Sequence, residues 1–237
     1  PSRLRREKKM RGRGFFASAV VAAIAITVAL VVSQRTHSKV FTKSELGTHD
    51  GAHPSQIMMA IFGEVFDVTA GRQFYEKGQS YDFFAGCDGS KAFVTGDFEN
   101  DVHDDVSSLT PGQLRDLKSW VNGTYHTKYV YQGLLEGFFY DKRGRRTENH
   151  TRVLDIIAKE DVAVALREKD EETYPKCSMR RSKTEHLVWC DDATKVPRRR
   201  SVYGGAERCA CVSFENQQDP NNKLYDNCPP RNSSCTR

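Results

Sequence analysis

The chain has 237 residues, of which 38% are hydrophobic and 28% are charged, and it contains seven cysteines. A chain of this length can bury one substantial core and a second, smaller module. Its formal net charge of +5 is uneven, because residues 1–14 carry +6, residues 15–140 carry −5 and residues 141–237 carry +4. Since the middle of the chain is acidic, the sequence argues against a nucleic-acid partner.

The first notable segment is residues 15–32, an uncharged stretch rich in Ala, Val and Ile that directly follows the basic tail at residues 1–14. It is longer than the core of most signal peptides and slightly shorter than a typical membrane-spanning helix. Its basic flank predicts that everything after it is translocated. Residues 15–33 are therefore either a signal peptide cleaved near Ser33 or a type II signal anchor. We expect a secreted protein, or a membrane-anchored one whose bulk is lumenal or extracellular.

Two further patterns are typical of the secretory pathway. Three sequons for N-glycosylation occur, at Asn122, Asn149 and Asn232. Six cysteines crowd the last quarter of the chain, namely Cys177, Cys190, Cys209, Cys211, Cys228 and Cys235. In an oxidising compartment they predict up to three disulfides, whose pairing the sequence leaves open. A zinc site is the alternative, although the cluster lacks a paired Cys-x-x-Cys spacing.

Residues 41–138 carry the sequence patterns of a small α+β domain. A capping box at Thr42-Lys-Ser-Glu45 predicts the start of a short helix. Two β-rich runs, residues 57–62 and 65–69, predict a hairpin around Gly63-Glu64. The Asp88-Gly-Ser90 run predicts the start of another helical turn.

An acidic loop and a second helix follow. Residues 97–105 carry five acidic side chains, and their spacing favours a solvated rim over a calcium site, because it fits no EF-hand loop. Residues 110–113 form a capping box with proline at the first helical position. The expected apolar face of this helix is Leu114, Leu117, Trp120 and Val121. We expect the helix to end at Asn122-Gly123 and a strand to cover residues 125–131.

The stretch with the clearest chemistry is residues 74–86, FYEKGQSYDFFAG. Tyr75 and Tyr81 flank a glycine-containing turn, and Phe83 and Phe84 follow at once, which suggests an aromatic pocket. A phenol in such a pocket stays a hydrogen-bonded alcohol, or it ionises and becomes a ligand of ferric iron. Aromatic residues beside a turn are more often ordinary core, so the pattern by itself does not choose between these outcomes.

The neighbouring blocks supply the missing context. FTKSEL, IMMAIFGEVFDVTAGRQFY, YDFFAGCDGSKAF and LRDLKSWVNGTYHTKYVYQGLL occur in this order between Phe41 and Leu135. Their order and spacing resemble the membrane-associated progesterone receptor branch of the cytochrome b5-like haem proteins. The resemblance implies a cytochrome b5-like haem-binding domain at residues 41–138.

The resemblance also implies a set of haem-binding residues. It makes the Tyr81 phenolate the axial ligand of ferric haem, and it makes Tyr75, Lys128 and Tyr129 supporting residues. The bis-histidine ligation of ordinary cytochrome b5 is not supported, because no HPGG block occurs. A phenolate ligand favours ferric over ferrous iron, so we expect a low potential. The isolated histidines, which we expect to be solvated and not second ligands, are His49, His53, His103 and His126.

The rest of the chain predicts a helix and a small module. Residues 147–172 carry an apolar stripe, with Thr151 as the expected cap, and we expect this helix to dock on the preceding domain. Residues 173–237 form a Cys-rich, disulfide-stapled module that could also contact a protein partner. Within it, the expected role of Arg198-Arg199-Arg200 is a solvated loop, with a processing site or a heparin-like contact as alternatives. Cys87 is expected to be a small buried side chain.

Two functions remain open at this point. The first is a non-enzymatic haem-binding protein of the secretory pathway or extracellular space, for which the resemblance implies a signalling or neuronal differentiation role. The alternative is an electron-transfer haem protein that partners a membrane oxidoreductase, which an acidic b5-like domain would suit. Steroid binding is a weaker option, suggested only by the name of the family.

Overall fold

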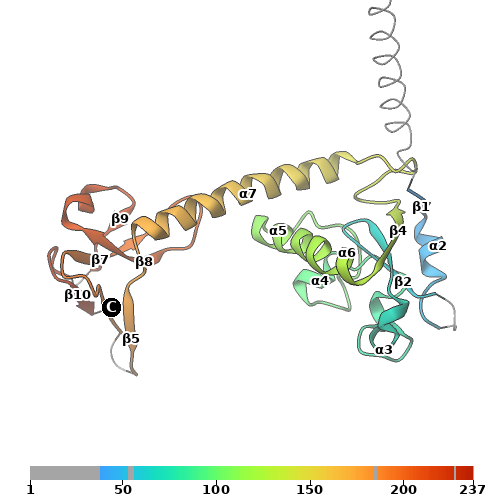
Figure 1. Cartoon of the computed structure of the whole chain (residues 1–237), viewed down its shortest axis with the longest axis horizontal. Coiled ribbons are helices and arrows are strands. Elements are labelled where there is room, and N and C mark those ends of the chain that lie inside the picture. Colours follow the sequence, from blue (N-terminus) through green and yellow to red (C-terminus); the bar gives the residue numbers. More distant parts are fainter. Residues whose placement is uncertain (1–37, 53–55, 184–185, 227, 237) are drawn as a thin grey trace, which may run out of the picture.

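The computed structural model describes residues 38–52, 56–183, 186–226 and 228–236. The expectations for the basic tail at residues 1–14 and the apolar segment at residues 15–33 fall outside this part of the chain. No helix within the described ranges is both long and apolar enough to span a membrane. The described chain has two folded parts joined by one long helix (Figure 1).

A four-stranded mixed sheet forms the scaffold of the first part. Its order is β1 (Val40–Phe41), β4 (Val130–Leu135), β3 (Glu64–Asp67) and β2 (Met58–Ile61), with β1 and β4 parallel and the other neighbours antiparallel. The expected hairpin is thus present, but its turn is Phe62-Gly63 and not Gly63-Glu64, because Glu64 already pairs with Ile61 in the sheet. Phe62 and Gly63 both have positive φ, as the tight turn of a two-residue hairpin requires.

Both predicted capping boxes are present. Thr42 Oγ1 accepts from the Glu45 amide at 3.1 Å and starts α2 (Lys43–Gly47). Thr110 Oγ1 accepts from the Gln113 amide at 3.3 Å and starts α5 (Pro111–Trp120). Each box satisfies two amide groups that a helix start leaves without partners.

The predicted start of a helix at Asp88 is displaced. The short helix α4 covers Ala92–Thr95, and Lys91 stands at its N-cap without a capping side chain. Asp88 Oδ1 accepts from the Ser90 amide at 2.8 Å, and Ser90 Oγ accepts from the Phe62 amide at 2.7 Å. Asp88 and Ser90 therefore bind this loop to the tip of the hairpin, which is a different use of the same side chains.

The chain after α5 contradicts two predictions. The helix does not end at Asn122-Gly123 but continues through a π-helical turn, η3 (Val121–Tyr125), into α6 (His126–Lys128). Tyr125 and Tyr129 are four residues apart and both are buried, so they follow a helical period. The strand expected over residues 125–131 begins only at Val130. Alternating aromatic and polar residues gave a false strand signal.

The core of this part lies between the sheet and the helices. Buried hydrophobic side chains from β2, β3, α5 and η3 pack together with residues from the loops around them. Three shorter elements line one side of this core: α3 (Arg72–Tyr75), η1 (Thr69–Gly71) and η2 (Asp82–Phe84). Of the predicted helical face of α5, Leu114, Leu117 and Val121 are buried, whereas Trp120 is 51% exposed.

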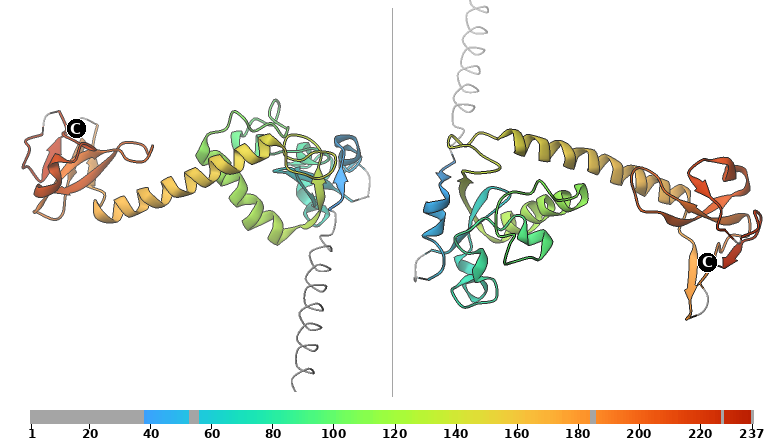
Figure 2. Two further views of the ribbon diagram at one scale, coloured as in Figure 1. Left: turned by 90° about the horizontal axis from the view of Figure 1, so that it is seen from above. Right: turned by 180° about the vertical axis from the view of Figure 1, so that it is seen from behind.

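The long helix α7 covers Glu148–Thr173 and begins with Thr147 as its cap, not Thr151, because Thr147 Oγ1 accepts from the His150 amide at 3.1 Å. Its docking on the first part is confirmed only near its start, where Val153 and Ile157 are buried and α5 lies alongside. Further along, Val162 is 61% exposed. The views in Figures 1 and 2 agree that α7 continues from there to the second part of the chain.

His150 is the titratable group in the docked turn of α7. It is buried, its Nδ1 lies 3.2 Å from the Phe139 carbonyl oxygen, and the rings of Phe62 and Tyr140 meet it edge-on. Burial lowers the pKa of His150 to about 4, with Arg146 and Lys118 adding to the shift. The neutral imidazole is therefore the form that packs between the core and α7.

We expect the stability of this domain to depend on His150 in acid. Because the folded pKa is below the unfolded value of 6.5, the unfolded state binds the proton first, and stability is lost as the pH falls from 6.5 to about 4. His150→Gln should remove the contribution of His150 to the change in the free energy of unfolding with pH. That contribution is at most about 1.4 kcal/mol per pH unit. Denaturant unfolding at pH 7 and pH 5 measures this, and a slope unchanged by the substitution would contradict it.

The second part of the chain contains two three-stranded sheets. One has the order β10 (Ser234–Thr236), β6 (His186–Trp189) and β5 (Ser178–Arg181). The other has the order β8 (Arg208–Ser213), β7 (Lys195–Arg200) and β9 (Asn222–Lys223). Both are antiparallel throughout. A short helical turn, η4 (Phe214–Gln218), follows β8.

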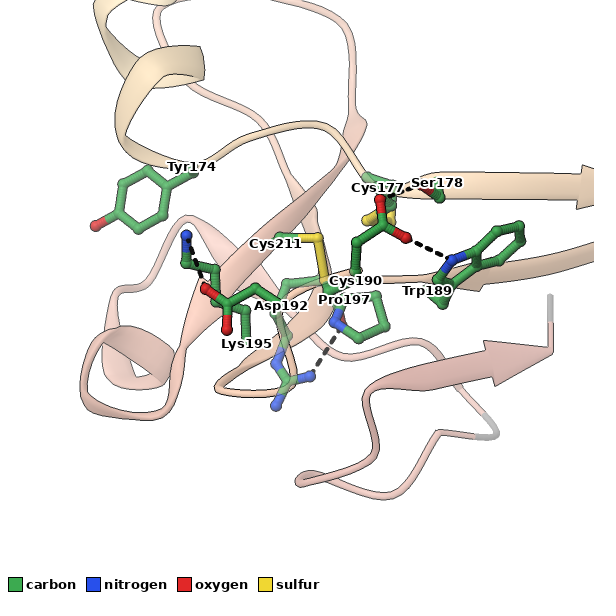
Figure 3. The surroundings of a disulfide bond; sticks show 12 residues. Tyr174, Cys177, Ser178, Trp189, Cys190, Asp192, Lys195, Pro197 and Cys211 are labelled. Carbon is green, nitrogen blue, oxygen red and sulfur yellow. Dashed lines mark hydrogen bonds and ion pairs between the residues drawn. A yellow bond between two sulfur atoms is a disulfide. The ribbon is translucent and has the colours of Figure 1, made fainter.

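Disulfides hold these sheets together. The pairs are Cys177–Cys209, Cys190–Cys211 and Cys228–Cys235, which confirms the predicted three bonds and uses all six clustered cysteines. The Sγ atoms of Cys177, Cys190 and Cys211 lie close together because two disulfides are adjacent, so the zinc alternative has no free thiolates here. Figure 3 shows the surroundings of Cys190–Cys211, with Trp189 Nε1 donating to Asp191 at 2.8 Å.

The arginine run is not the solvated loop that we expected. It lies in strand β7, where Arg198 and Arg200 are both buried. Arg200 forms a two-pronged ion pair with Asp170 at the end of α7, and its guanidinium also stacks on Tyr174 at 4.0 Å. Arg208 reaches the same Asp170 at 2.7 Å. These ion pairs attach the disulfide-bonded module to α7. A processing site or a heparin contact would need an exposed run of arginines, and Arg198 and Arg200 are buried.

Candidate functional site

A cleft of 330 Å³ opens between the tyrosine stretch and the chain after α5. Its volume is within the range of small-molecule pockets, and its walls are mainly aromatic. The residues that line it are Tyr75, Tyr81, Phe84, Phe93, Phe98, Trp120, Thr124, Tyr125, Lys128 and Tyr129. All four residues that the sequence resemblance selected, Tyr75, Tyr81, Lys128 and Tyr129, are therefore brought to one cavity.

Tyr81 stands at the mouth of the cleft. It precedes η2, and its amide donates to the Phe74 carbonyl at 2.8 Å while its own carbonyl accepts from the Phe84 amide at 3.1 Å. The side chain is 45% exposed, with the rings of Tyr75 and Phe84 at centroid distances of 6.4 and 6.5 Å. The backbone thus holds in place a tyrosine that lines the cleft and stays partly exposed.

Tyr75 is the deeper phenol. It belongs to α3, it is buried, and its Oη lies 3.2 Å from Tyr125 Oη. Burial, together with Tyr125 and Tyr129, raises the pKa of Tyr75 far above its usual value. Burial also raises the pKa of Tyr125 to about 12. Both groups are therefore neutral phenols at physiological pH and can act as hydrogen-bond donors.

Lys128 and Tyr129 close the cleft from the end of α6. Lys128 Nζ lies 5.3 Å from the centre of the Tyr129 ring and 5.7 Å from that of Phe74, which are cation–π distances. Tyr129 meets Tyr75 edge-on at 6.1 Å. The ammonium group is thus held at the rim, where it can attract an anionic group of a ligand that enters the cleft.

Sequence reasoning missed several lining residues. Phe93, Phe98 and Trp120 supply apolar wall, and Tyr125 supplies a fourth phenol at the back. Tyr125 was assigned to a strand, and the π-helical turn that aims it inward has no simple sequence signature. The four-residue spacing of Tyr125 and Tyr129 was the one available signal, because residues four apart share a helix face.

The wall formed by Phe84 depends on a glycine. A Cβ atom on Gly89 would lie 2.6 Å from Cε1 of the Phe84 ring and closer still to Cδ1, which real contacts do not allow. We expect Gly89→Ala to displace this ring and to lower the free energy of unfolding by about 1–3 kcal/mol. Thermal unfolding measures the change, with Gly112→Ala as the control, since a Cβ there meets nothing within 4 Å. Equal losses of stability in Gly89→Ala and Gly112→Ala would contradict the expected clash between a Cβ at position 89 and the Phe84 ring.

The histidines considered as second ligands do not line the cleft in the described chain, from which His53 is excluded. His126 Nε2 lies 2.7 Å from Glu64, and His49 Nδ1 lies 3.0 Å from the Gln56 carbonyl oxygen. His103 Nδ1 accepts from the Asp105 amide at 3.1 Å. These three rings therefore have other partners.

The expectation that Cys87 is buried is wrong, because the residue is exposed. The Ala60 amide donates to the Cys87 carbonyl, and Asp88 forms a β-bridge with Ala60, so the segment runs beside β2 like a strand. Side chains of an extended segment alternate between two sides. Asp88 takes the buried side, which leaves Cys87 facing outward.

The carboxylates of the acidic loop at residues 97–105 have hydrogen-bond and ion-pair partners within the protein. Asp97 accepts from the Glu99 and Asn100 amides at 3.1 and 3.0 Å, and Asp101 pairs with Lys91 at 2.8 Å. Asp104 is buried and bonds Lys43 at 2.9 Å. Because these carboxylates are already engaged in turns and ion pairs, the loop provides no converging oxygen set of the kind that calcium needs.

The predicted glycosylation sites all lie in the described chain. Asn122 and Asn232 are exposed and Asn149 is partly exposed. Asn122 lies in η3, on the same turn as Thr124, which lines the cleft. Modification at the three asparagines stays a prediction.

The residues present fit a haem group. The cleft offers apolar aromatic walls for a flat macrocycle, a partly exposed tyrosine among its lining residues, and a lysine at the rim for a carboxylate. Phenolate is a known ligand of haem iron. The donor set thus agrees with the chemistry that the sequence resemblance implied.

Comparison with known proteins places the chain among relatives. The family model "Cytochrome b5-like Heme/Steroid binding domain" matches residues 42–135. Neuferricin of Xenopus tropicalis is 37% identical over 191 residues, which cover 75% of this chain and 68% of that protein. Neuferricin of Mus musculus is 31% identical over 256 residues, which cover 95% of this chain and 97% of that protein.

The match to a plant relative also covers most of the chain. Membrane-associated progesterone-binding protein 4 of Arabidopsis thaliana is 31% identical over 206 residues, and the match covers 83% of each chain. The similarity to these relatives thus continues beyond the cytochrome b5-like domain into α7 and the disulfide-bonded module. The chain belongs to the neuferricin family, within the membrane-associated progesterone receptor branch of the cytochrome b5-like proteins.

Proposed function

We propose that this protein binds ferric haem in the cleft through the phenolate of Tyr81, and that it does so as a non-enzymatic protein. The observation that carries the proposal is the convergence of Tyr75, Tyr81, Lys128 and Tyr129 on one aromatic cavity in a cytochrome b5-like domain. Bound haem would supply an iron centre that a phenolate keeps in the ferric state.

Each residue has a separate task in this proposal. Tyr81 is at the mouth and is partly exposed, so it is the ligand. Tyr75 and Tyr129 pack edge to face and form the wall behind it. Lys128 places a positive charge at the rim, where it offsets the negative charge of a propionate. Phe84, Phe93 and Trp120 exclude water from the macrocycle.

We also propose a secretory address. Disulfides persist in oxidising compartments, and all six cysteines of the last quarter are paired. The sequons at Asn122, Asn149 and Asn232 support the same compartment, as does the apolar segment at residues 15–33. The protein is then secreted or held as a type II membrane protein. A signalling or neuronal differentiation role is the activity proposed for such a factor, from its family resemblance.

Electron transfer is the weaker alternative. Fast electron carriers of the cytochrome b5 type clamp iron between two histidines, whereas His49, His103 and His126 have other partners here. A single phenolate ligand disfavours the ferrous state, which a shuttle must reach easily. The proposal therefore favours haem handling over electron carriage.

Titration of the purified, haem-free protein with hemin tests the proposal. We expect saturation at one haem per chain and an absorption spectrum of high-spin ferric iron with a phenolate ligand. A protein that stays colourless after hemin addition and gel filtration would refute haem binding. A parallel titration with a steroid distinguishes the option carried by the family name.

A further inference from the structure

Tyr125 lies at the back of the cleft and is only 2% exposed. The π-helical turn η3 directs its ring inward, and π-helical turns are frequent at functional sites. Its Oη has two polar neighbours, Tyr75 Oη at 3.2 Å and Met59 Sγ at 3.7 Å. Tyr125 is therefore placed to influence Tyr75, whose ring lies 6.4 Å from that of Tyr81, centroid to centroid.

The number of protons fixes the direction of these hydrogen bonds. A phenol carries one proton, and a thioether sulfur only accepts. The proton between Tyr125 and Met59 therefore belongs to Tyr125, whose oxygen then accepts from Tyr75. The chain of hydrogen bonds runs from Tyr75 through Tyr125 to Met59. In this arrangement the single proton of Tyr75 goes to Tyr125 at the back of the cleft, so Tyr75 can only accept in its other side-chain hydrogen bond, with Tyr129.

We propose that Tyr125 is a positioning residue that strengthens Tyr81 as an iron ligand by holding the proton of Tyr75 away from it. This inference rests on the proposed function. A hydrogen bond donated to a phenolate withdraws charge from its oxygen and makes it a weaker ligand. With the Tyr75 proton held by Tyr125, the Tyr81 oxygen keeps its full charge and favours ferric iron.

Two features make this arrangement stable. Tyr75 and Tyr125 are both buried, and each phenol oxygen has a hydrogen-bond partner inside the protein. The acceptor at the end of the chain, Met59, is fully buried in β2, so water does not compete for the proton of Tyr125. The direction of the chain is thus set by the fold.

Two substitutions on different elements test the proposal. Tyr125→Phe, in η3, removes the acceptor, so the Tyr75 proton is free to turn toward Tyr81. Met59→Leu, in β2, removes the sulfur acceptor, so Tyr125 donates to Tyr75 and again frees the Tyr75 proton. Tyr140→Phe is the matched control, because Tyr140 is a buried phenol that packs on His150 and does not line the cleft.

Each protein is loaded with hemin, checked for folding by circular dichroism, and titrated with a reductant. We expect Tyr125→Phe and Met59→Leu to raise the ratio of ferrous to ferric haem affinity about tenfold, the effect of one charge-assisted hydrogen bond. The phenolate-to-iron charge-transfer band should move to shorter wavelength in both. Tyr140→Phe should match the wild type, and neither effect should appear in a Tyr75→Phe background.

The outcomes separate this inference from the proposed function. A Tyr125→Phe protein that binds haem with the wild-type potential and spectrum would overturn the inference and leave haem binding intact. A shift in the opposite direction, or one that persists with Tyr75→Phe, would also overturn it. Failure of the wild-type protein to bind hemin would refute the proposed function and the inference with it.

Discussion

Tyr81→Phe should abolish the phenolate spectrum of the haem-loaded protein and weaken hemin binding more than about 100-fold. Mutation of groups that only support a metal ligand typically costs 10- to 100-fold in affinity, so removal of the ligand itself should cost more. The phenyl ring of the variant keeps the contacts with Tyr75 and Phe84, so the loss would report the oxygen alone. Hemin titration followed by absorption spectroscopy measures both quantities.

The control for this experiment is Tyr203→Phe. Tyr203 is an exposed tyrosine in the loop between β7 and β8, outside the cleft, so its hydroxyl should not affect haem. Equal affinity of Tyr81→Phe and Tyr203→Phe would show that Tyr81 is not the ligand. Loss of affinity with an unchanged spectrum would show that Tyr81 shapes the cleft without touching iron.

Asp170→Ala should lower the free energy of unfolding of the disulfide-bonded module by about 1.5–3 kcal/mol, because it removes the carboxylate that bonds the buried guanidinium of Arg200 and the partly buried one of Arg208, while Asp219 still pairs with Arg200. The Asp170 side chain is only 8% exposed, and that of Arg200 only 5%, and Arg208 shares the same carboxylate. Denaturant unfolding measures the loss. Hemin binding should be unaffected, since Asp170 is near the end of α7 that joins the second folded part (Figure 1), whereas the residues that line the cleft belong to the first.

Asp161→Ala is the matched control on the same helix. Asp161 pairs with Arg115 at 2.8 Å, but both side chains are largely exposed, and such pairs contribute about 0–1 kcal/mol. Burial opposes the charge of Asp170, but hydrogen bonds from Arg200 and Arg208 outweigh it and lower the pKa. The stabilisation is therefore present above the usual carboxyl pKa of 3.8 and is lost as the pH falls through the lowered value. Equal losses for both alanine variants would contradict the buried network.

The parts of the fold that the sequence predicted depend on local chemistry. The capping boxes at Thr42 and Thr110 require only a side chain and an amide three residues away, so they are visible in the sequence. The hairpin at Gly63 is equally local. The cleft residues Tyr75, Tyr81, Lys128 and Tyr129 came from recurring blocks, and the structure brings all four together.

The parts that sequence reasoning missed depend on tertiary contacts. The π-helical turn that orients Tyr125 and the burial of Arg198 and Arg200 follow from partners distant in the chain, such as Met59 and Asp170. A run of arginines is normally solvated. Here Arg200 is buried against the carboxylates of Asp170 and Asp219. Arg198 is buried against the Gln217 side chain and the carbonyl oxygens of Pro197 and Pro230. No local sequence pattern predicts contacts with residues so distant in the chain.

The spectrum of ferric haem bound to the wild-type protein shows directly whether Tyr81 is the iron ligand. We expect a one-to-one complex of high-spin ferric iron with a phenolate charge-transfer band that disappears in Tyr81→Phe. A low-spin spectrum typical of two histidine ligands, unchanged by that substitution, would contradict it.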